Sequence, residues 1–350
     1  MNNQPERIDS ELQESGMLAT VADAVSDLVT GTTIPAPIRR NALKAFGRLC
    51  TAAIEIPAAY LEGKAEEKRA ETEARVKIIS TTANQIAENI KVDPEYARVA
   101  VRKYGERIVR EQINLDDVVQ IAADEIRQKA TAPAEQDKTT EGHEISNDWL
   151  NHFEKEASQK STREMQLLFG RILAGEIQRP SSFSIKTVKL VAELDSRVAA
   201  LFRTLCSLSI SLKAGDHIID ARVASLGGQA AGNALKKYGL SFDQLNVLQE
   251  FGLIISDYSS YMDYRTSIAN ESKVVALPFF HQNRVWALVP SSEVSEETKE
   301  LRVPGVALSR SGKELMKIVD TQTRDEYTAA LKEYFKGLDF WMVPIKPQTN

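Results

Sequence analysis

Residues 147–190 constrain the fold more than any other stretch, because helix starts, apolar faces and a proline stop follow one another closely: NDWLNHFEKEASQKSTREMQLLFGRILAGEIQRPSSFSIKTVKL. The four-residue spacing of Trp149, Phe153 and Ala157 predicts a first short helix. A second helix is expected to begin at the capping box of Ser161 and Glu164. Its core-facing residues recur every three or four positions and precede Pro180: Met165, Leu168, Phe169, Ile172, Leu173 and Ile177.

Two more capped helices complete a predicted central bundle over residues 147–208. Ser184 is placed to cap one of them and Asp195 the next, and short connections favour an antiparallel arrangement. Gly170 lies inside the second helix, where glycine costs about 1 kcal/mol relative to alanine. We therefore expect a neighbouring helix to approach closely there. Arg171 and Glu176 could form an internal ion pair, but surface charges are the preferred interpretation.

This stretch also resembles a known family. It is similar to the signature of a bacterial family known as domain of unknown function 2806, and more distantly to abortive-infection alpha-type proteins. A weaker likeness covers residues 34–77. The resemblance brings no established activity, cofactor or catalytic residue; it implies a bacterial setting and, by analogy, a role near phage defence. The residues that carry the likeness are Trp149, Phe153, Ser161, Glu164, Met165, Gln166, Arg171, Ile172, Leu173, Ala174, Gly175, Glu176, Pro180, Ser182, Phe183, Ser184 and Thr187.

The chain as a whole is too long for one bundle, since 350 residues suggest two or three domains. A formal net charge of −5 gives no global attraction to nucleic acid. Cys50 and Cys206 fall on apolar helical faces, so we expect reduced core thiols in the cytosol. The polar first residues argue against a secretory signal, and no apolar run is long enough to predict a membrane span. A cytoplasmic location is expected.

Residues 1–130 are predicted to form an all-helical region. A helix over residues 39–53 carries Arg40, Lys44 and Arg48 at four-residue spacing. A basic face of this kind can sit on an anionic membrane surface or bind polyanions. It can equally be the solvated face of an ordinary bundle helix.

A heptad seam follows within residues 58–90 and could join two copies of the protein as a coiled coil. Alternatively, the seam packs internally against the next helix, which Asp93 and Pro94 open. The apolar positions assigned to that next helix are Tyr96, Val99, Ala100, Tyr104 and Ile108. The seam itself consists of Thr72, Val76, Ile79, Ala83, Ile86 and Ile90.

Residues 131–146 have almost no large apolar side chains and are interpreted as a linker. Residues 209–350 are predicted to form a smaller α+β region. Ser241 and Gln244 cap a helix that stops at Gly252, and strand-like runs at 274–280, 284–289 and 301–308 follow. This order is typical of a winged-helix-like module.

Nucleic-acid binding by that module is not favoured. The helix in the recognition position contains two acidic residues and no basic one, although Lys236 and Lys237 lie just before it and remain possible contacts. From Leu201 onward the chain has 17 basic and 17 acidic residues. Phosphate contacts supply most of the affinity of DNA-binding proteins, so this balance argues against the interpretation.

Signatures of enzymes are weak. Asp216, His217 and Asp220 come nearest to a metal or acid–base cluster, but a turn with an exposed histidine explains them as well. The glycines of residues 226–235 lack the preceding strand of a dinucleotide fingerprint. The four histidines are scattered: His143, His152, His217 and His281. We expect no catalytic, cofactor-binding or metal site.

The sequence therefore predicts a mainly α protein with long N-terminal helices, a central helical bundle and a smaller winged-helix-like region. We expect a non-catalytic protein that works by homo-oligomeric assembly and contact with a protein partner, in an antiphage response. One alternative is a winged-helix regulator that binds nucleic acid. Another is an effector on a membrane surface that uses Arg40, Lys44 and Arg48.

Overall fold

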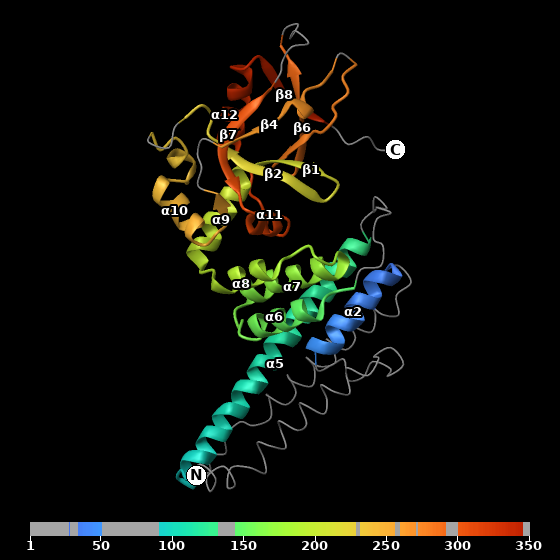
Figure 1. Ribbon diagram of the computed structural model, residues 1–350, viewed down its shortest axis with the longest axis vertical. Coiled ribbons are helices and arrows are strands. Elements are labelled where there is room, and N and C mark those ends of the chain that lie inside the picture. The colour runs from blue at the N-terminus through green and yellow to red at the C-terminus, as the bar shows by residue number, and fades with distance from the viewer. Residues whose placement is uncertain are drawn as a thin grey trace, which may run out of the picture. The chain divides into compact units, whose positions relative to one another are not determined.

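The structure is a computed structural model in which two compact units are distinguished, Met1–Ala192 and Glu193–Asn350. The described part of the first unit is helical, whereas the second combines helices with an eight-stranded antiparallel sheet (Figure 1). A mainly helical protein with a β part is thereby confirmed. The residues that the structure describes are 28, 34–50, 91–131, 144–228, 232–255, 260–270, 272–291 and 300–345.

The first unit is built around a long helix. Helix α5 (Pro94–Thr131) packs along α7 (Arg163–Gln178), and α2 (Ala36–Leu49) and α6 (Asn147–Ala157) add to the same core. Helix α8 (Ile185–Glu193) follows. The helices begin and end close to the predicted positions because the apolar stripes and the stop at Pro180 specify them locally. The second helix nevertheless begins at Arg163, two residues after the predicted capping box at Ser161.

The predicted close approach at Gly170 is confirmed, and the neighbour is α5. A Cβ atom on Gly170 would lie 2.4 Å from Cγ2 of Ile121 and 3.3 Å from the backbone oxygen of Val118. Only a residue without a side chain lets the two helices pack at this distance. The packing between α5 and α7 thus offsets the conformational cost of a glycine inside a helix.

The bundle core is aromatic where the sequence predicted it to be. Trp149 stacks on Phe153 with ring centroids 4.9 Å apart, and Phe153 contacts Phe169 at 5.6 Å. Phe169 is fully buried, as are Ile172 and Leu173. Met165, expected in the same stripe, is only half-buried at the edge of the core.

The division into units differs from the one expected from composition. The boundaries expected at residues 131–146 and 208 separate an N-terminal region from the central bundle, yet α2 and α5 pack on α7 within one unit. The unit boundary lies instead between Ala192 and Glu193. A polar stretch in the sequence does not mark a unit boundary here, because helices on either side of it share one core. Most of that stretch, residues 132–143, lies outside the described residues.

The second unit begins with α9 (Ser196–Leu208), whose predicted cap is confirmed by a hydrogen bond of 2.8 Å from Val198 N to Asp195 Oδ1. The sheet has the strand order β3-β7-β2-β1-β5-β6-β8, with β4 pairing β7. Helix α12 packs against β8. The strands are β1 (Ile210–Ala214), β2 (His217–Ala224), β3 (Ile254–Ile255), β4 (Tyr261–Asp263), β5 (Phe279–His281), β6 (Arg284–Pro290), β7 (Arg302–Leu308) and β8 (Phe340–Ile345), and the remaining helices are α10 (Phe242–Glu250), α11 (Arg310–Met316) and α12 (Asp325–Lys336).

Several local signals in this unit are confirmed, whereas the strand-like run expected at 274–280 forms a strand only from Phe279 onward. The capping box of Ser241 and Gln244 forms at α10, and Gly252 has the positive φ of 69° with which the chain leaves that helix. The two residues between β5 and β6, Gln282 and Asn283, both have positive φ, as a tight hairpin requires. This hairpin belongs to the eight-stranded sheet, and the winged-helix-like arrangement stays a prediction.

The first two strands were not predicted. Residues 210–224 form the β1–β2 hairpin, with Gly215 and Asp216 in the turn and His217 exposed beside it. Gly215 has a φ of 56°, which favours glycine. The turn and the exposed histidine agree with the alternative interpretation of Asp216 and His217 as a turn that carries an exposed histidine. The flanking strands supply the middle of the sheet.

Candidate interaction surface

The N-terminal part of α5 exposes apolar side chains that the sequence assigned to a helix-packing face. Tyr96, Val99 and Tyr104 are 68%, 48% and 55% exposed, so the assignment of these three residues to a buried face is wrong. The covered side of this segment carries Ala97, which is 2% exposed, and the half-buried Val101, Gly105 and Ile108. Helix periodicity predicts that one face is apolar, but the neighbours of a helix decide which face is covered.

The remainder of α5 packs in the core of the first unit, so the exposed segment belongs to a continuous helix that is held at its other end. Asp93 accepts a hydrogen bond of 2.7 Å from the backbone N–H of Glu95 and so caps the start of α5. Toward the other end, Val118, Val119 and Ala122 are fully buried. A site on a well-anchored helix is held more rigidly than a site on a loop.

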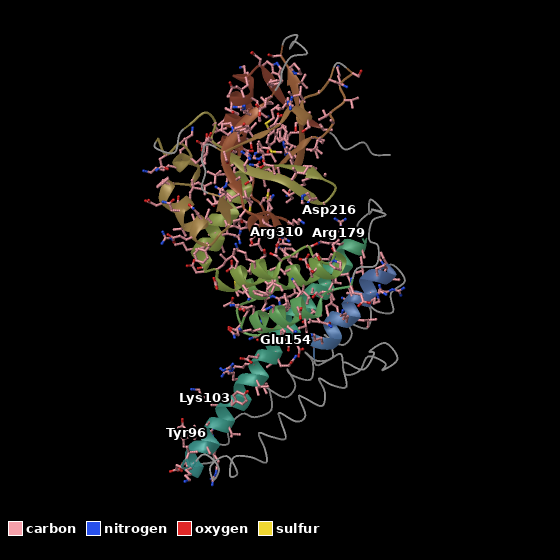
Figure 2. The ribbon with its side chains drawn as sticks, in the orientation of Figure 1. Tyr96, Lys103, Glu154, Arg179, Asp216 and Arg310 are labelled. Carbon is pink, nitrogen blue, oxygen red and sulfur yellow. The ribbon has the colours of Figure 1, made fainter. Side chains whose placement is uncertain are left out.

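Basic side chains lie among these exposed apolar ones. The Arg107 guanidinium donates to Glu111 at 2.7 Å. Within the described parts of the chain, Arg98, Arg102 and Lys103 have no hydrogen-bonding or ion-pair partner, and all three are exposed. Figure 2 shows Tyr96 and Lys103 on the same side of α5. We give the name α5 surface to seven of the exposed side chains of this segment: Tyr96, Arg98, Val99, Arg102, Lys103, Tyr104 and Arg107. The acidic side chains of Glu95 and Glu106 are exposed on the same segment.

The basic residues predicted on α2 have a different environment. Lys44 Nζ lies 3.3 Å from Glu144 Oε2 and donates to the backbone oxygen of Ile145 at 2.7 Å. Arg40 lies 3.8 Å from the same glutamate. Arg48 pairs with Glu154 at 3.4 Å and also hydrogen-bonds to Asn151. These three cations join α2 to residues 144–154 of the bundle, which leaves less positive charge for an anionic surface.

The other predicted contact residues are spread out. Lys236 and Lys237 lie in a short 3-10 helix of the second unit, where the Lys237 ammonium sits 4.8 Å from the ring centroid of Tyr238. The predicted oligomer seam, Val76, Ile79, Ala83, Ile86 and Ile90, lies outside the described residues. Among the described residues, the two predicted basic groups belong to different elements: Arg40, Lys44 and Arg48 lie on α2, and Lys236 and Lys237 lie in the 3-10 helix of the second unit.

The stretch that carries the family resemblance, residues 147–190, includes the turn that follows α7. Glu176 is 2% exposed, and its carboxylate accepts backbone N–H bonds from Ser181 at 2.6 Å and Phe183 at 3.0 Å. The indole Nε1 of Trp149 donates to the backbone oxygen of Phe183 at 2.7 Å. The expectation that Glu176 is a surface charge is therefore wrong, because its carboxylate is turned inward and accepts two backbone N–H bonds from the turn after α7, one of them from the buried Phe183. Arg171 pairs instead with Glu125 at 3.1 Å.

The second unit contains a buried ion pair. The Arg222 guanidinium donates twice to Asp220, at 2.7 and 2.8 Å, and also to the backbone oxygens of Ser260 and Val303. The Tyr264 hydroxyl donates to the same aspartate at 3.1 Å, and burial raises the pKa of Tyr264 well above its usual value, with the charge of Asp220 adding to the effect. A network satisfied in this way holds strands together. Asp220 thus has a structural role, because it binds the side chains of Arg222 and Tyr264 in the core of this unit.

His281 is buried in the same unit. Its ring nitrogens face the backbone oxygen of Ser209 at 3.0 Å and the Thr328 hydroxyl at 2.9 Å, and burial lowers its pKa. Among the residues with described placement, no three His, Cys, Asp or Glu side chains come together as metal ligands would. Nor is any helix in the described ranges long and apolar enough to cross a membrane.

Fold and surface together define a class: a two-unit protein in which a helical bundle, carrying an exposed basic and aromatic helix segment, precedes an antiparallel sheet unit. The chain belongs to the family described as protein of unknown function (DUF2806), whose model matches residues 97–332. No curated protein and no solved structure matches the chain. The likeness to abortive-infection alpha-type proteins is not shown by these comparisons.

Proposed function

We propose that the protein is a non-catalytic binding protein that engages a macromolecular partner through the α5 surface. The observation that carries the proposal is the exposure of Tyr96 and Tyr104 on a helix whose other end is anchored in a packed core. Tyrosine offers a large, rigid contact area with a polar tip, and it is enriched among residues that dominate binding energy. Val99 between them extends the apolar contact area.

The setting that we propose is a bacterial antiphage response. It rests on the resemblance of residues 148–187 and remains an analogy. We also propose that the protein self-associates through the heptad seam of residues 72–90. An assembly would multiply the number of α5 surfaces, and several linked binding sites bind an extended partner more tightly than one does.

A phage-challenge assay tests this function. Cells that express the wild type should give fewer plaques than cells with an empty vector. The double variant Tyr96→Ser/Tyr104→Ser should lose this protection. As a matched control, Tyr261→Ser removes an exposed tyrosine of the other unit and should protect fully. Both variants should unfold at the wild-type temperature, because substitutions on exposed surfaces usually change stability by under about 0.5 kcal/mol.

Two results would count against the proposal. Protection that is unchanged in the double variant would refute the role of the α5 surface, and a wild type without protection would refute the antiphage setting. A benzophenone side chain introduced in place of Tyr104 tests the surface independently of the setting. Upon irradiation in cells it should cross-link to a partner, whereas the same group in place of Tyr261 should not.

A further inference from the structure

Strand β8 forms one end of the described sheet. It pairs with β6 on one side, and no described strand pairs with its other side (Figure 1). Its sequence, FWMVPI, contains no charged residue. Proteins protect open sheet edges with charged side chains or prolines, because such edges pair readily with other chains. Of these protective features, β8 has only Pro344.

The ladder between β6 and β8 shows which backbone groups of β8 point away from the sheet. The N–H of Ser291 donates to the backbone oxygen of Asp339 at 2.9 Å, so these residues form a hydrogen-bonded pair. Bonded and non-bonded pairs alternate in an antiparallel ladder, so every second residue of β8 directs its backbone groups toward β6: Trp341, Val343 and Ile345. The others direct theirs outward, and proline has no N–H, so they offer two donors and three acceptors: Phe340, Met342 and Pro344. These outward groups have no hydrogen bond to another described residue.

The side chains on one face of β8 are apolar and accessible. Trp341 is 49% exposed, and Val343 on the same face is half-buried. The opposite face carries Phe340 and Met342, which belong to the core of the unit. Side chains of directly opposite residues in neighbouring strands lie about 4.5–5.5 Å apart. A further strand on this edge would therefore cover part of the Trp341 ring.

We propose that β8 pairs antiparallel with β8 of a second copy of this chain, around a two-fold axis at Met342. Met342 then lies opposite Met342 of the second copy, and Phe340 lies opposite Pro344. Both outward donors of each strand meet acceptors, which gives four hydrogen bonds between the copies. The missing N–H of Pro344 falls at the two ends of the shared ladder. The occupant is a second copy because one edge supplies matching donors and acceptors, as a two-fold contact requires.

The length of β8 selects this register. A register centred on Trp341 would also form four hydrogen bonds, but it would pair only three residues of each strand before β8 ends. The register centred on Met342 pairs five, and it places Trp341 directly opposite Val343 of the second copy. Pairs of an aromatic and a β-branched side chain stabilise neighbouring strands. The two-fold axis makes this contact occur twice.

Sedimentation velocity of the full-length protein tests the contact. Trp341→Lys and Val343→Glu should each weaken association at least tenfold, because each substitution enters the interface twice and brings like charges close to each other. An equimolar mixture of the two variants should associate again, since the introduced lysine then faces the introduced glutamate. Ile255→Lys is the matched control, because Ile255 is 55% exposed on β3 at the other end of the sheet, and it should sediment as the wild type does.

Disulfide formation tests the register and does not depend on the charge variants. An equimolar mixture of Trp341→Cys and Val343→Cys should cross-link upon oxidation, because opposite residues of a non-bonded pair have Cα atoms about 4.5 Å apart. Trp341→Cys alone should not cross-link, since its two copies lie diagonally at about 7–8 Å. The natural cysteines, Cys50 and Cys206, are buried.

Three results would overturn the inference. They are an unchanged mass for Trp341→Lys, a mixture of the charge variants that associates no better than either variant alone, and cross-linking by Trp341→Cys alone. The seam variant Ile79→Asp/Ile86→Asp should leave the cross-link between the two cysteine variants in place. A contact through β8 and a contact through the heptad seam are thereby distinguished.

Discussion

Replacing Glu176 with alanine should destabilise the first unit. The carboxylate is 2% exposed and is the acceptor for the backbone N–H groups of Ser181 and Phe183. Alanine leaves the buried N–H of Phe183 without this acceptor, which costs about 1–3 kcal/mol, whereas Ser181 is exposed and its N–H can bond to water. Ser181 also has a φ of 70°, a strained conformation for a residue other than glycine that these bonds hold in place.

Calorimetry gives the measurement. One kcal/mol shifts the unfolding temperature of a domain of 150–250 residues by about 2–4 °C, so a central loss of about 2 kcal/mol lowers it by about 4–8 °C. Glu176→Gln keeps one carbonyl acceptor and should fall between alanine and the wild type. The exposed Glu106→Ala serves as the control and should shift the transition by less than about 2 °C. An alanine variant at position 176 that melts with the wild type would show that water or another group satisfies the turn, and the reasoning would fail.

Three further predictions concern packing, pH and assembly. Gly170→Ala should destabilise the protein by about 1–3 kcal/mol in denaturant titrations, despite alanine's better helix propensity, because the added Cβ meets Ile121 at 2.4 Å. Burial lowers the pKa of His281 from its ordinary value of 6.5, so the unfolded chain binds a proton at higher pH than the folded protein. The unfolding free energy should therefore fall below about pH 6.5, by at most about 1.4 kcal/mol per pH unit, and His281→Gln should reduce this slope; equal slopes would contradict the assignment. Ile79→Asp/Ile86→Asp should lower the mass seen by light scattering, and a wild type that is already monomeric would rule the seam out as an interface.

Much of the fold could be predicted from local signals. Some signals act within a few residues of sequence and can be predicted without knowledge of the tertiary contacts. They are the helix caps at Ser241 and Asp195, the helix stop at Gly252 and the hairpin turn at Gln282. The apolar stripe of α7 is equally local. The packing of α2 and α5 on α7 is not, because it depends on which helices share a core.

The incorrect predictions arise because burial depends on which side chains meet in the folded protein. The β1–β2 hairpin does alternate apolar residues on both sides of its glycine turn, a signal that was available, but Asp220 and Arg222 look like exposed residues in the sequence. Each is buried because it neutralises the other. Glu176 was misread similarly, although a carboxylate followed by a turn rich in serine offers a hint of capping. Tyr96 and Tyr104 look like core residues in the sequence, and only the exposure of their side chains in the structure identifies a surface.

The strand order has a consequence for synthesis on the ribosome. Strand β2 pairs on one side with β1, which precedes it directly, and on the other with β7, which begins at Arg302. At about 5–20 residues per second, the intervening chain of about 80 residues takes roughly 4–16 s to emerge. During that interval one edge of β2 has no strand to pair with, and open edges recruit other chains. We therefore expect nascent chains that pause before β7 to be prone to aggregation.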